Sequence, residues 1–366
     1  MKVLSITPAF YPSKGGIEQV VYELARRARD LGYFTDVAHL DVSCKQVEEG
    51  SINGVRFFRL PMRGGRLLGL APALRKLVRN YDLLHVHDPQ LLAITANVQF
   101  FGRGLPAVLS THGGFWHTRK FALPKSLYEK FFLSASLRRY RRILATSVAD
   151  QEYFAHYSGN VVLCNNGVSI ERFAEISLEG SGDVNSWIYW GRLSRNKRID
   201  QVIDIVSLAK ARGHRIRLLI CGGDFDGILT DLRSKVARLE LQDNVRFAPY
   251  LDEAALLYEL GRCGVFITAS DHEGFGLSVV EAMAAGRIVI CKDISPLNTF
   301  VQHGVSGFFL NFDGGEKDSF LLKDLLSMND EQRASISEAA VLVAEKYNWN
   351  EAVANFCGYF EAALNC

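Results

Sequence analysis

Short apolar runs alternate with longer amphipathic stretches along almost the whole chain. The short runs are rich in Val, Ile and Leu, as in strands buried on both faces, and the longer stretches carry apolar residues at helical spacing. This alternation predicts an α/β fold in which helices cover parallel sheets. The expected strands are Val3–Ile6, Thr35–Leu40, Val55–Phe58, Leu83–Val86, Ala107–Ser110, Ile143–Ala145, Val161–Leu163, Trp187–Trp190, Arg217–Ile220, Val245–Ala248, Val265–Thr268, Ile288–Cys291 and Gly307–Leu310.

The length of 366 residues indicates two domains. A single hydrophobic core rarely grows beyond about 250–300 residues. No low-complexity linker interrupts the chain, so we expect a tight join near residues 166–184. We predict an N-terminal domain over residues 1–168, a C-terminal domain over residues 169–348 and a last helix over about 349–366. The apolar positions of that helix are Val353, Phe356, Phe360 and Leu364.

Composition places the chain among globular proteins, with 48% hydrophobic and 22% charged residues. Its seven cysteines are odd in number and scattered, and no CxxC pair or Cys/His cluster suggests zinc. We therefore expect reduced thiols in a cytoplasmic protein. The first apolar run ends at Pro8, too early for a signal peptide, and no run approaches the roughly 20 residues of a membrane span.

The net charge of +2 hides a difference between the two halves. Residues 1–168 hold 22 Lys and Arg against 12 Asp and Glu, which gives +10, and the remaining 20 against 28 give −8. A basic N-terminal half suggests an anionic partner there, either a membrane surface or a phosphate-bearing substrate.

The excess of positive charge is densest in residues 119–142, with eight cations and one acid, Glu129, among Phe, Leu and Tyr. Residues 63–79 add arginines and a lysine among leucines. This pattern resembles an interfacial helix on anionic lipid. A solvated helix face would explain the charges but not their confinement to one half. Nucleic acid is the other anionic partner, but no known binding module is recognisable.

One stretch, residues 270–286, combines glycines and acids at a predicted strand-to-helix turn. Gly274 and Gly276 allow a ligand to approach the main chain, and the N–H groups that begin the next helix suit an anion such as a diphosphate. Glu273 precedes that helix and Glu281 lies about one turn inside it. The two carboxylates could flank one bound molecule. The alternative is a plain turn whose acids complement the helix dipole.

Three other loops follow predicted strands. Gly15-Gly16 precedes a helix expected from Glu18 to Gly32, where close approach to phosphate or sugar oxygens and an ordinary turn are both open. His112 stands beside two glycines after Ala107–Ser110, and is either a cleft residue or a histidine satisfied within its loop. Arg192 and Lys197 follow Trp187–Trp190 and, taken alone, would be solvent-exposed charges.

Together these motifs resemble the retaining glycosyltransferases of family four. The string HEGFG…VEAMAAG is similar to their E-x7-E signature, and Arg192 to Lys197 matches their Arg-x4-Lys pattern. The resemblance implies the GT-B fold, with two Rossmann-like doubly wound domains facing across a cleft. It also implies an acceptor-binding N-terminal domain, a nucleotide-sugar-binding C-terminal domain, and a last helix that crosses back to the first domain.

The resemblance also implies roles for individual residues. His112 and Glu273 would contact the transferred sugar, Arg192 and Lys197 would clamp the diphosphate, and Glu281 would bind the ribose. We expect His112, Glu273, Arg192 and Lys197 to act in catalysis, and no cofactor or metal to take part. The expected donor-binding residues are Gly15, Gly16, Arg192, Lys197, Glu273, Gly274, Phe275, Gly276, Leu277 and Glu281.

Two positions depart from this pattern. Arg198 occupies the place of the usual glycine after the lysine, and Ser169 replaces the last residue of the N-G-V-D motif. Asp224-Phe225-Asp226 could be mistaken for a metal-binding D-x-D, but it follows a glycine turn, so we expect solvated loop carboxylates. His117 is a weaker candidate than His112, and we expect His85 and His87 to be structural or to support the site.

Within the family, the loops around His112 and Glu273 are most similar to xanthan-type exopolysaccharide mannosyltransferases. Such enzymes transfer mannose from GDP-mannose to a polyprenyl-diphosphate-linked saccharide at the inner face of the cytoplasmic membrane. The resemblance thus implies a peripheral membrane enzyme that retains anomeric configuration by front-face displacement. The alternatives are a UDP-sugar donor, a GT-B sugar-nucleotide epimerase and a non-catalytic scaffold.

Overall fold

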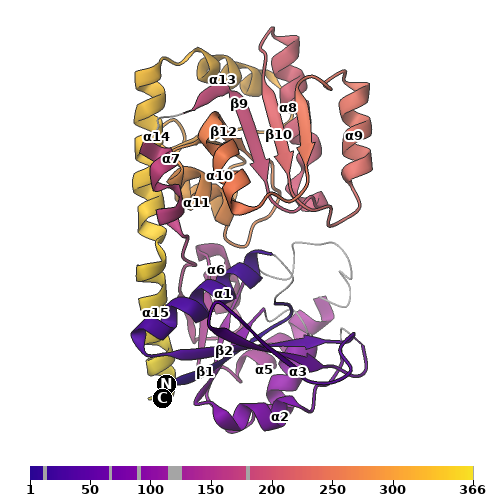
Figure 1. The fold of residues 1–366 in the computed structure, drawn as a ribbon, viewed down its shortest axis with the longest axis vertical. Coiled ribbons are helices and arrows are strands. Elements are labelled where there is room, and N and C mark those ends of the chain that lie inside the picture. The colour runs from indigo at the N-terminus through magenta and orange to yellow at the C-terminus, as the bar shows by residue number, and fades with distance from the viewer. Residues whose placement is uncertain (11–14, 66–67, 89–91, 114–125, 179–181, 366) are drawn as a thin grey trace. The chain divides into compact units, whose positions relative to one another are not determined.

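The computed structural model describes all residues except 11–14, 66–67, 89–91, 114–125, 179–181 and 366. The chain divides into two compact units, each with its own sheet (Figure 1). Unit 1 comprises Met1–Gly167 and Trp349–Cys366, and unit 2 comprises Val168–Asn348. None of the helices that the structure describes combines the length and apolar character needed to cross a bilayer.

Unit 1 is built on an eight-stranded sheet in the order β3-β4-β2-β1-β5-β6-β7-β8. All neighbouring strands are parallel except the edge strand β3, which runs antiparallel to β4. The strands are β1 (Lys2–Thr7), β2 (Phe34–Asp41), β3 (Glu48–Ile52), β4 (Val55–Pro61), β5 (Leu83–His87), β6 (Ala107–Ser110), β7 (Arg142–Ala145) and β8 (Val161–Leu163).

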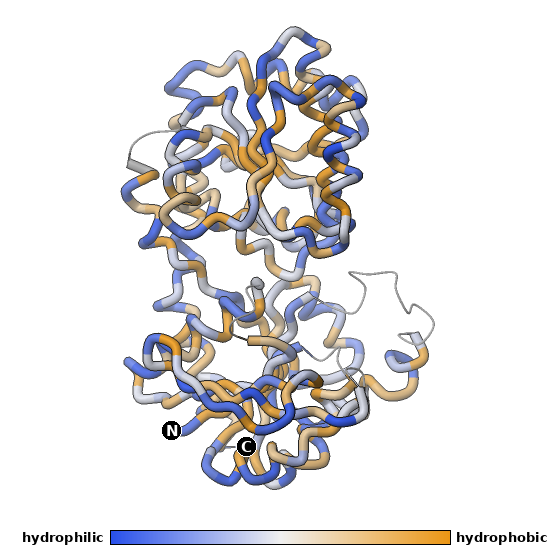
Figure 2. Tube along the Cα trace, turned by 45° about the vertical axis from the view of Figure 1, so that its right-hand side comes forward, coloured by the Kyte–Doolittle hydropathy of each residue, from blue (hydrophilic) through white to orange (hydrophobic). Residues whose placement is uncertain are grey.

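Unit 2 has a six-stranded, wholly parallel sheet in the order β11-β10-β9-β12-β13-β14. Its strands are β9 (Asp183–Trp190), β10 (Arg217–Cys221), β11 (Val245–Ala248), β12 (Cys263–Ile267), β13 (Ile288–Cys291) and β14 (Phe308–Phe309). The central strands β12 and β13 are buried at every residue, and Figure 2 shows apolar and polar stretches alternating along the trace of both units.

Helices cover both faces of each sheet, because two separate apolar clusters form on the two sides. The helices of unit 1 are α1 (Gly16–Ala28), α2 (Leu74–Leu77), α3 (Leu92–Phe101), α5 (Ser134–Leu137), α6 (Val148–Ala155) and α15 (Trp349–Leu364), with a π-helical turn η4 (Glu129–Leu133). Those of unit 2 are α7 (Ala174–Leu178), α8 (Ile199–Ala211), α9 (Leu229–Arg238), α10 (Glu253–Arg262), α11 (Leu277–Ala284), α12 (Leu297–Phe300), α13 (Glu316–Ser327) and α14 (Asp330–Ala344).

Every predicted strand is present, and the prediction missed one, β3. The sequence of β3 is Glu-Glu-Gly-Ser-Ile, and most of its residues are exposed. An edge strand pairs on one side only and has little surface to bury, so it carries no apolar signal. The α/β prediction is therefore correct, and its one omission lies where the sheet meets solvent.

The last helix, α15, belongs to unit 1 and packs against α1. Its Phe356 and Phe360 are fully buried, with ring centroids 5.8 and 5.0 Å from that of His85 on β5. Three of the four predicted apolar positions, Val353, Phe356 and Phe360, are thus buried, whereas Leu364 is 39% exposed at the end of the helix. His85 itself is fully buried and lies 2.7 Å, measured from Nε2, from the hydroxyl of Ser110.

Burial of His85 predicts a pH dependence of stability in unit 1. Desolvation, with the charge of His112, lowers the pKa of His85 from 6.5 to about 3. The folded state therefore binds fewer protons than the unfolded state between these values, and stability falls as pH falls below about 6.5. We expect His85→Phe to be less stable at pH 7 but to lose about 1.4 kcal/mol less per pH unit between pH 6 and 4. Hydrogen exchange of β5 and β6 amides measures both slopes, and equal slopes would contradict the assignment.

Candidate active site

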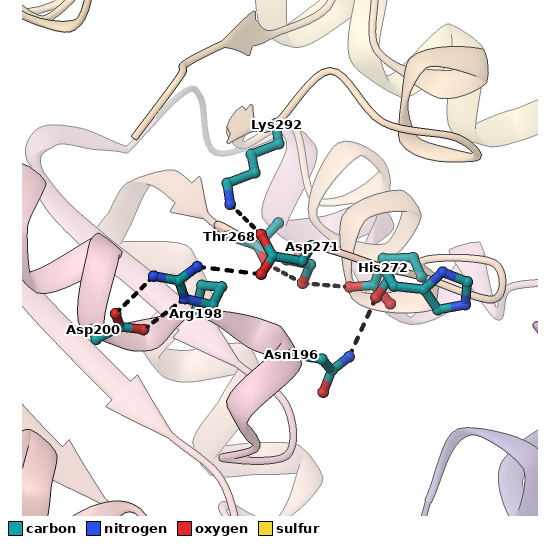
Figure 3. A network of polar contacts seen from close by, with 9 residues as sticks. Asn196, Arg198, Asp200, Thr268, Asp271, His272 and Lys292 are labelled. Atoms are coloured by element: carbon teal, nitrogen blue, oxygen red, sulfur yellow. Dashed lines mark hydrogen bonds and ion pairs between the residues drawn. The ribbon is translucent and has the colours of Figure 1, made fainter. Parts of the chain in front are cut away.

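Two loops of unit 2 meet at one edge of its sheet. The first runs from the end of β9 to the 3-10 turn η6 (Arg195–Lys197), and the second from the end of β12 to the start of α11. Because β9 and β12 are parallel neighbours, their carboxyl ends lie side by side. The amide of Asp271 donates to the carbonyl of Asn196 at 2.8 Å, and the Asn196 side chain donates to the carbonyl of His272 at 3.3 Å (Figure 3).

Lys197 and Glu273, one from each loop, form a short ion pair. The Nζ of Lys197 lies 2.6 Å from Oε1 of Glu273, and the side chains expose only 15% and 9% of their surface. The hydroxyl of Ser270 donates to the same Oε1 at 2.7 Å. Among the described residues no hydrogen-bond partner reaches Oε2. The structure therefore brings together two residues that the sequence assigned to the diphosphate and the sugar.

Arg192 lies exposed in the first loop, and its guanidinium stands 4.9 Å from the ring centroid of Phe225. The carbonyl of Arg192 accepts a hydrogen bond from the hydroxyl of the buried Tyr189 at 2.9 Å. The main chain of this loop is thus anchored, while the cation faces outward on an aromatic ring. That arrangement suits an anionic ligand.

The Asp224-Phe225-Asp226 segment supports this loop from the end of β10. Asp226 accepts the amide of Arg195 at 2.9 Å, and Asp224 accepts the amide of Ile228 at 2.8 Å. Both carboxylates are therefore bonded to the main chain, and were not simply solvated as expected. In the described part of the chain no three His, Cys, Asp or Glu residues are grouped to hold a metal.

The turn into α11 requires glycine at position 276. Gly276 has φ +93°, and a Cβ there would lie 2.6 Å from Leu297 Cδ2. The ring of Phe275 is buried against those of Phe300 and Tyr347, at centroid distances of 5.1 and 5.9 Å. A ligand at this turn can therefore reach the main chain of Phe275 but not its ring.

Glu281 lies on the first turns of α11, nearly buried, and accepts the indole N–H of Trp190 at 3.2 Å. Trp190 is the last residue of β9, so the second acid is fixed to the strand that leads into the Arg192 loop. The four charged residues that the sequence singled out in this half thus belong to two adjacent loops and to α11, the helix that follows the second loop.

The resemblance assigns Glu281 to the ribose of GDP. Trp190→Phe is therefore expected to raise the dissociation constant for GDP about tenfold with little change in kcat, because a lost hydrogen bond to a carboxylate costs about 1.5–3 kcal/mol. Trp187→Phe is the matched control. Trp187 lies on the other face of the same strand and donates to the carbonyl of Val184 at 2.8 Å. Calorimetric titration with GDP distinguishes the two variants. Equal affinities would remove Glu281 from the nucleotide site.

Arg198, where the family usually has glycine, adopts φ +46° in the left-handed region. Its guanidinium bonds to Asp200 at 3.1 Å and to Asp271 at 3.3 Å, and Lys292 also pairs with Asp271 (Figure 3). The hydrogen bond to Asp200 raises the pKa of Arg198. Burial acts to raise the pKa of Asp271, but Lys292 and Arg198 hold it below its usual value. The unusual cation therefore ties the two loops together.

In unit 1 the candidate residues follow β1 and β6, the two strands that flank β5 in the sheet. Gly15 caps α1 after β1, and a Cβ on it would lie 2.4 Å from Oε2 of Glu18. Gly16 is exposed and begins α1. The helix thus begins at Gly16, two residues before the predicted start at Glu18, and His117 lies outside the described residues.

His112 follows β6 and contacts His87 at the end of β5. His87 Nδ1 and His112 Nε2 are 3.0 Å apart, and the rings stack with centroids 5.3 Å apart. Burial lowers the pKa of His112 to about 3, so the ring is neutral at pH 7. The loop is held by Asp150 on α6, which accepts the amide of Gly113 at 2.9 Å and the hydroxyl of Thr111 at 2.5 Å.

Several supporting residues were not predicted from the sequence. Asp150 could have been noticed, because Ser147 and Asp150 have the spacing of a helix cap, and the Ser147 hydroxyl does accept the Asp150 amide. Asn196, Ser270, Asp271 and Lys292 carried no local signal. Their roles depend on which strands are neighbours in the sheet.

Comparison with known proteins bears on the whole chain. A family model described as "Glycosyltransferase Family 4" matches residues 14–172, and one described as "Glycosyl transferases group 1" matches residues 174–342. The GDP-mannose:cellobiosyl-diphosphopolyprenol alpha-mannosyltransferase of Xanthomonas campestris is 29% identical, covering 100% of this chain and 97% of the relative. The phosphatidyl-myo-inositol mannosyltransferase of Mycobacterium tuberculosis is 23% identical, covering 99% and 97%.

Solved structures confirm the expected fold. Anabaena HepE, in complex with UDP and glucose, has a TM-score of 0.78 at 20% identity and covers 99% of each chain. Sucrose-phosphate synthase from Thermosynechococcus elongatus has a TM-score of 0.77 at 18% identity, again with 99% coverage of each chain. The two family models, the full-length relatives and the two Rossmann-like sheets agree. The chain therefore belongs to the family-four glycosyltransferases of GT-B fold.

Proposed function

We propose that this glycosyltransferase moves mannose from GDP-mannose to a polyprenyl-diphosphate-linked saccharide, with retention of configuration. The observation that carries the proposal is full-length similarity, at 28–29% identity, to three proteins named GDP-mannose:cellobiosyl-diphosphopolyprenol alpha-mannosyltransferase from Xanthomonas and Komagataeibacter. The Lys197–Glu273 pair at the end of β9 and β12 supports a shared donor site.

The charges of unit 2 suit the donor. Arg192 and Lys197 place positive charge where the leaving diphosphate gains negative charge, which lowers the barrier without general acid catalysis. Glu273 holds hydroxyls of the sugar and stabilises the positive charge that develops on it. Glu281, fixed by Trp190 at 3.2 Å, binds the ribose.

The proposed transfer is a front-face displacement. The acceptor hydroxyl oxygen forms a bond to C1 of mannose on the face from which GDP departs. The bond between C1 and the β-phosphate oxygen breaks, and its electron pair stays with the phosphate. The acceptor proton passes to that phosphate oxygen, so GDP and the extended saccharide are the products.

A donor panel with a lipid-linked saccharide acceptor tests the proposal. We expect mannose to be transferred from GDP-mannose with α configuration, and UDP-sugars to be poor donors. Transfer from a UDP-sugar and not from GDP-mannose would contradict the donor assignment. Release of free sugar and nucleotide without acceptor would support an epimerase, and donor binding without turnover would support a scaffold.

For the acceptor, we propose that unit 1 rests on the anionic inner face of the cytoplasmic membrane through η4. Phe131 and Phe132 are each 61% exposed, and Leu127 is 49% exposed just before the turn. Lys130 is exposed among them and lies 5.5 Å from the Phe131 ring centroid. Adjacent exposed aromatic rings beside a cation suit the headgroup region of anionic lipid.

Not all cations of the basic segment, residues 119–142, are free to contact a membrane. Arg139 donates to the carbonyls of Gly102 and Leu105 at 2.7 and 2.8 Å, and Arg141 donates to that of Ala363 at 2.6 Å. Those two cations therefore stabilise the fold. Arg138 is exposed, while Arg119, Lys120 and Lys125 lie outside the described residues.

Changing Phe131 and Phe132 together to serine is expected to weaken binding to vesicles with anionic lipid by at least about tenfold, because each ring loses about 1.5–3 kcal/mol of full burial. Phe320→Ser is the matched control, since Phe320 is 65% exposed on α13 of unit 2. Vesicle flotation measures both. Unchanged binding by the double variant would place the membrane contact elsewhere.

A further inference from the structure

The contact between His87 and His112 determines which nitrogen of His112 can carry a proton. His87 Nδ1 lies 3.0 Å from His112 Nε2, and both rings are neutral near pH 7 because burial lowers their pKa values. In a bond between two neutral imidazoles, one nitrogen donates and the other accepts. Two arrangements are therefore possible, and they leave Nδ1 of His112 either protonated, as a donor to a ligand, or unprotonated, as an acceptor.

The other nitrogen of His87 decides between them. His87 is fully buried, and its Nε2 has no hydrogen-bond partner among the described residues. If His112 donated, His87 would carry its own proton on Nε2, which would leave a buried N–H without an acceptor. Orphaned buried N–H groups are rarer than under-satisfied acceptors. The favoured state has the proton on His87 Nδ1, which donates to His112 Nε2.

His85 follows the same rule. Its Nε2 lies 2.7 Å from the Ser110 hydroxyl, while its Nδ1 is buried and meets no hydrogen-bond partner in the described part of the chain. The ring centroid of His85 lies 4.0 Å from that of His87, and Phe356 and Phe360 close the other side. His87 is therefore fixed in place by packing, and its Nδ1 is directed at His112 by the fold.

We infer that His87 is a positioning residue that holds His112 as its Nδ1–H tautomer, so that His112 donates a hydrogen bond to an oxygen of the transferred sugar. The inference deepens the proposed function and rests on it for the identity of the sugar. No proton is transferred. The hydrogen bond from His87 instead fixes the direction of the His112 Nδ1–H donor before the substrate binds. Less reorganisation of the site is then needed on binding.

Nitrogen-15 spectra of the full-length protein, labelled on histidine, test the tautomer directly. Spectra of His87→Asn and His112→Asn assign the two rings. We expect the wild-type His112 to show a protonated Nδ1 and an unprotonated Nε2 at pH 7. A wild-type His112 protonated on Nε2 would overturn the inference, whatever the activity of the enzyme.

Two substitutions of His87 separate hydrogen bonding from packing. The amide nitrogen of asparagine falls near the position of Nδ1, and that of glutamine near the position of Nε2. We expect His87→Asn to keep kcat/KM with the sugar donor within about threefold, and His87→Gln to lower it about 10-fold to 100-fold. His112 should revert to mixed tautomers in the glutamine variant only. Equal losses in both variants would assign His87 a packing role and overturn the inference.

Binding of GDP alone is the control for general damage to the His87 variants. Because GDP lacks the sugar, its dissociation constant should not change in His87→Gln, although turnover falls. A parallel loss of GDP affinity would indicate general damage and count against the inference. If the wild-type tautomer is as expected but GDP-mannose is not a substrate, the proposed donor is wrong and the positioning of His112 by His87 is still supported.

Discussion

Replacing Lys197 by alanine is expected to lower kcat by about 10²–10³-fold, the usual effect of removing one group that stabilises transition-state charge. Lys197 stands 2.6 Å from Glu273, and both side chains are largely withdrawn from solvent. In the proposed donor site the variant loses a cation at the departing diphosphate, and it also leaves the Glu273 carboxylate without its counterion. Steady-state transfer from GDP-mannose measures the effect, with circular dichroism to check folding.

Arg195→Ala is the matched control, because Arg195 is an exposed cation of the same 3-10 turn. Its amide, which bonds to Asp226 at 2.9 Å, is kept in the variant. We expect kcat to change less than threefold. Near-normal turnover by Lys197→Ala would remove Lys197 from the diphosphate clamp, and an equal loss in Arg195→Ala would show that the loop responds to total charge only.

The second large effect is expected at Glu273. Glu273→Gln keeps the shape of the side chain and an oxygen for Ser270 and Lys197, but removes the negative charge. We expect kcat to fall about 10²–10³-fold, because the positive charge developing on the sugar loses its stabilising partner. Glu316→Gln, an exposed isosteric change at the start of α13, is the control and should leave kcat unchanged.

Azide distinguishes the role of Glu273 from that of a covalent nucleophile. In a front-face displacement, Glu273 forms no bond to C1, so azide should not restore turnover to Glu273→Ala. Formation of a glycosyl azide by that variant would instead indicate a double displacement.

The double variant of Lys197 and Glu273 should be less impaired than the product of the single losses, since the two residues act as one unit.

The sequence predicted the site residues that come after a run of apolar residues. Arg192, Glu273 and His112 all come directly after strands that are buried on both faces, and such strands are easily recognised. Parallel sheets place these positions at one edge. Gly276 was also predictable as a turn residue, but not the position of Leu297, whose Cδ2 lies 2.6 Å from where a Cβ of residue 276 would be.

What could not be predicted is contact between distant loops. Lys197 and Glu273 are 76 positions apart and meet only because β12 pairs with β9, although β10 and β11 intervene in the chain. Strand order is a property of the whole sheet and leaves no mark on either loop. The same holds for His87 and His112, which come from neighbouring strands 25 positions apart.

The prediction made for Arg198 from the sequence is correct in part. The sequence marked it as a departure from glycine that could alter the loop or add a cation. The backbone keeps the left-handed conformation that glycine favours, with φ +46°, and the cation is held by Asp200 and Asp271. The loop shape therefore survives the substitution, at a strain of about 1–3 kcal/mol offset by side-chain bonds that only the folded structure reveals.

The place of α15 in unit 1 has a consequence for synthesis of the chain. Phe356 and Phe360 cover His85 only after all of unit 2, residues 168–348, has been made. At roughly 5–20 residues per second, translation of those residues takes on the order of 10–40 seconds, during which the part of the first sheet around His85 lacks the cover of α15. Unit 1 is thus the first unit to be started and the last to be completed. Chaperones that bind apolar surface can act on it during that interval.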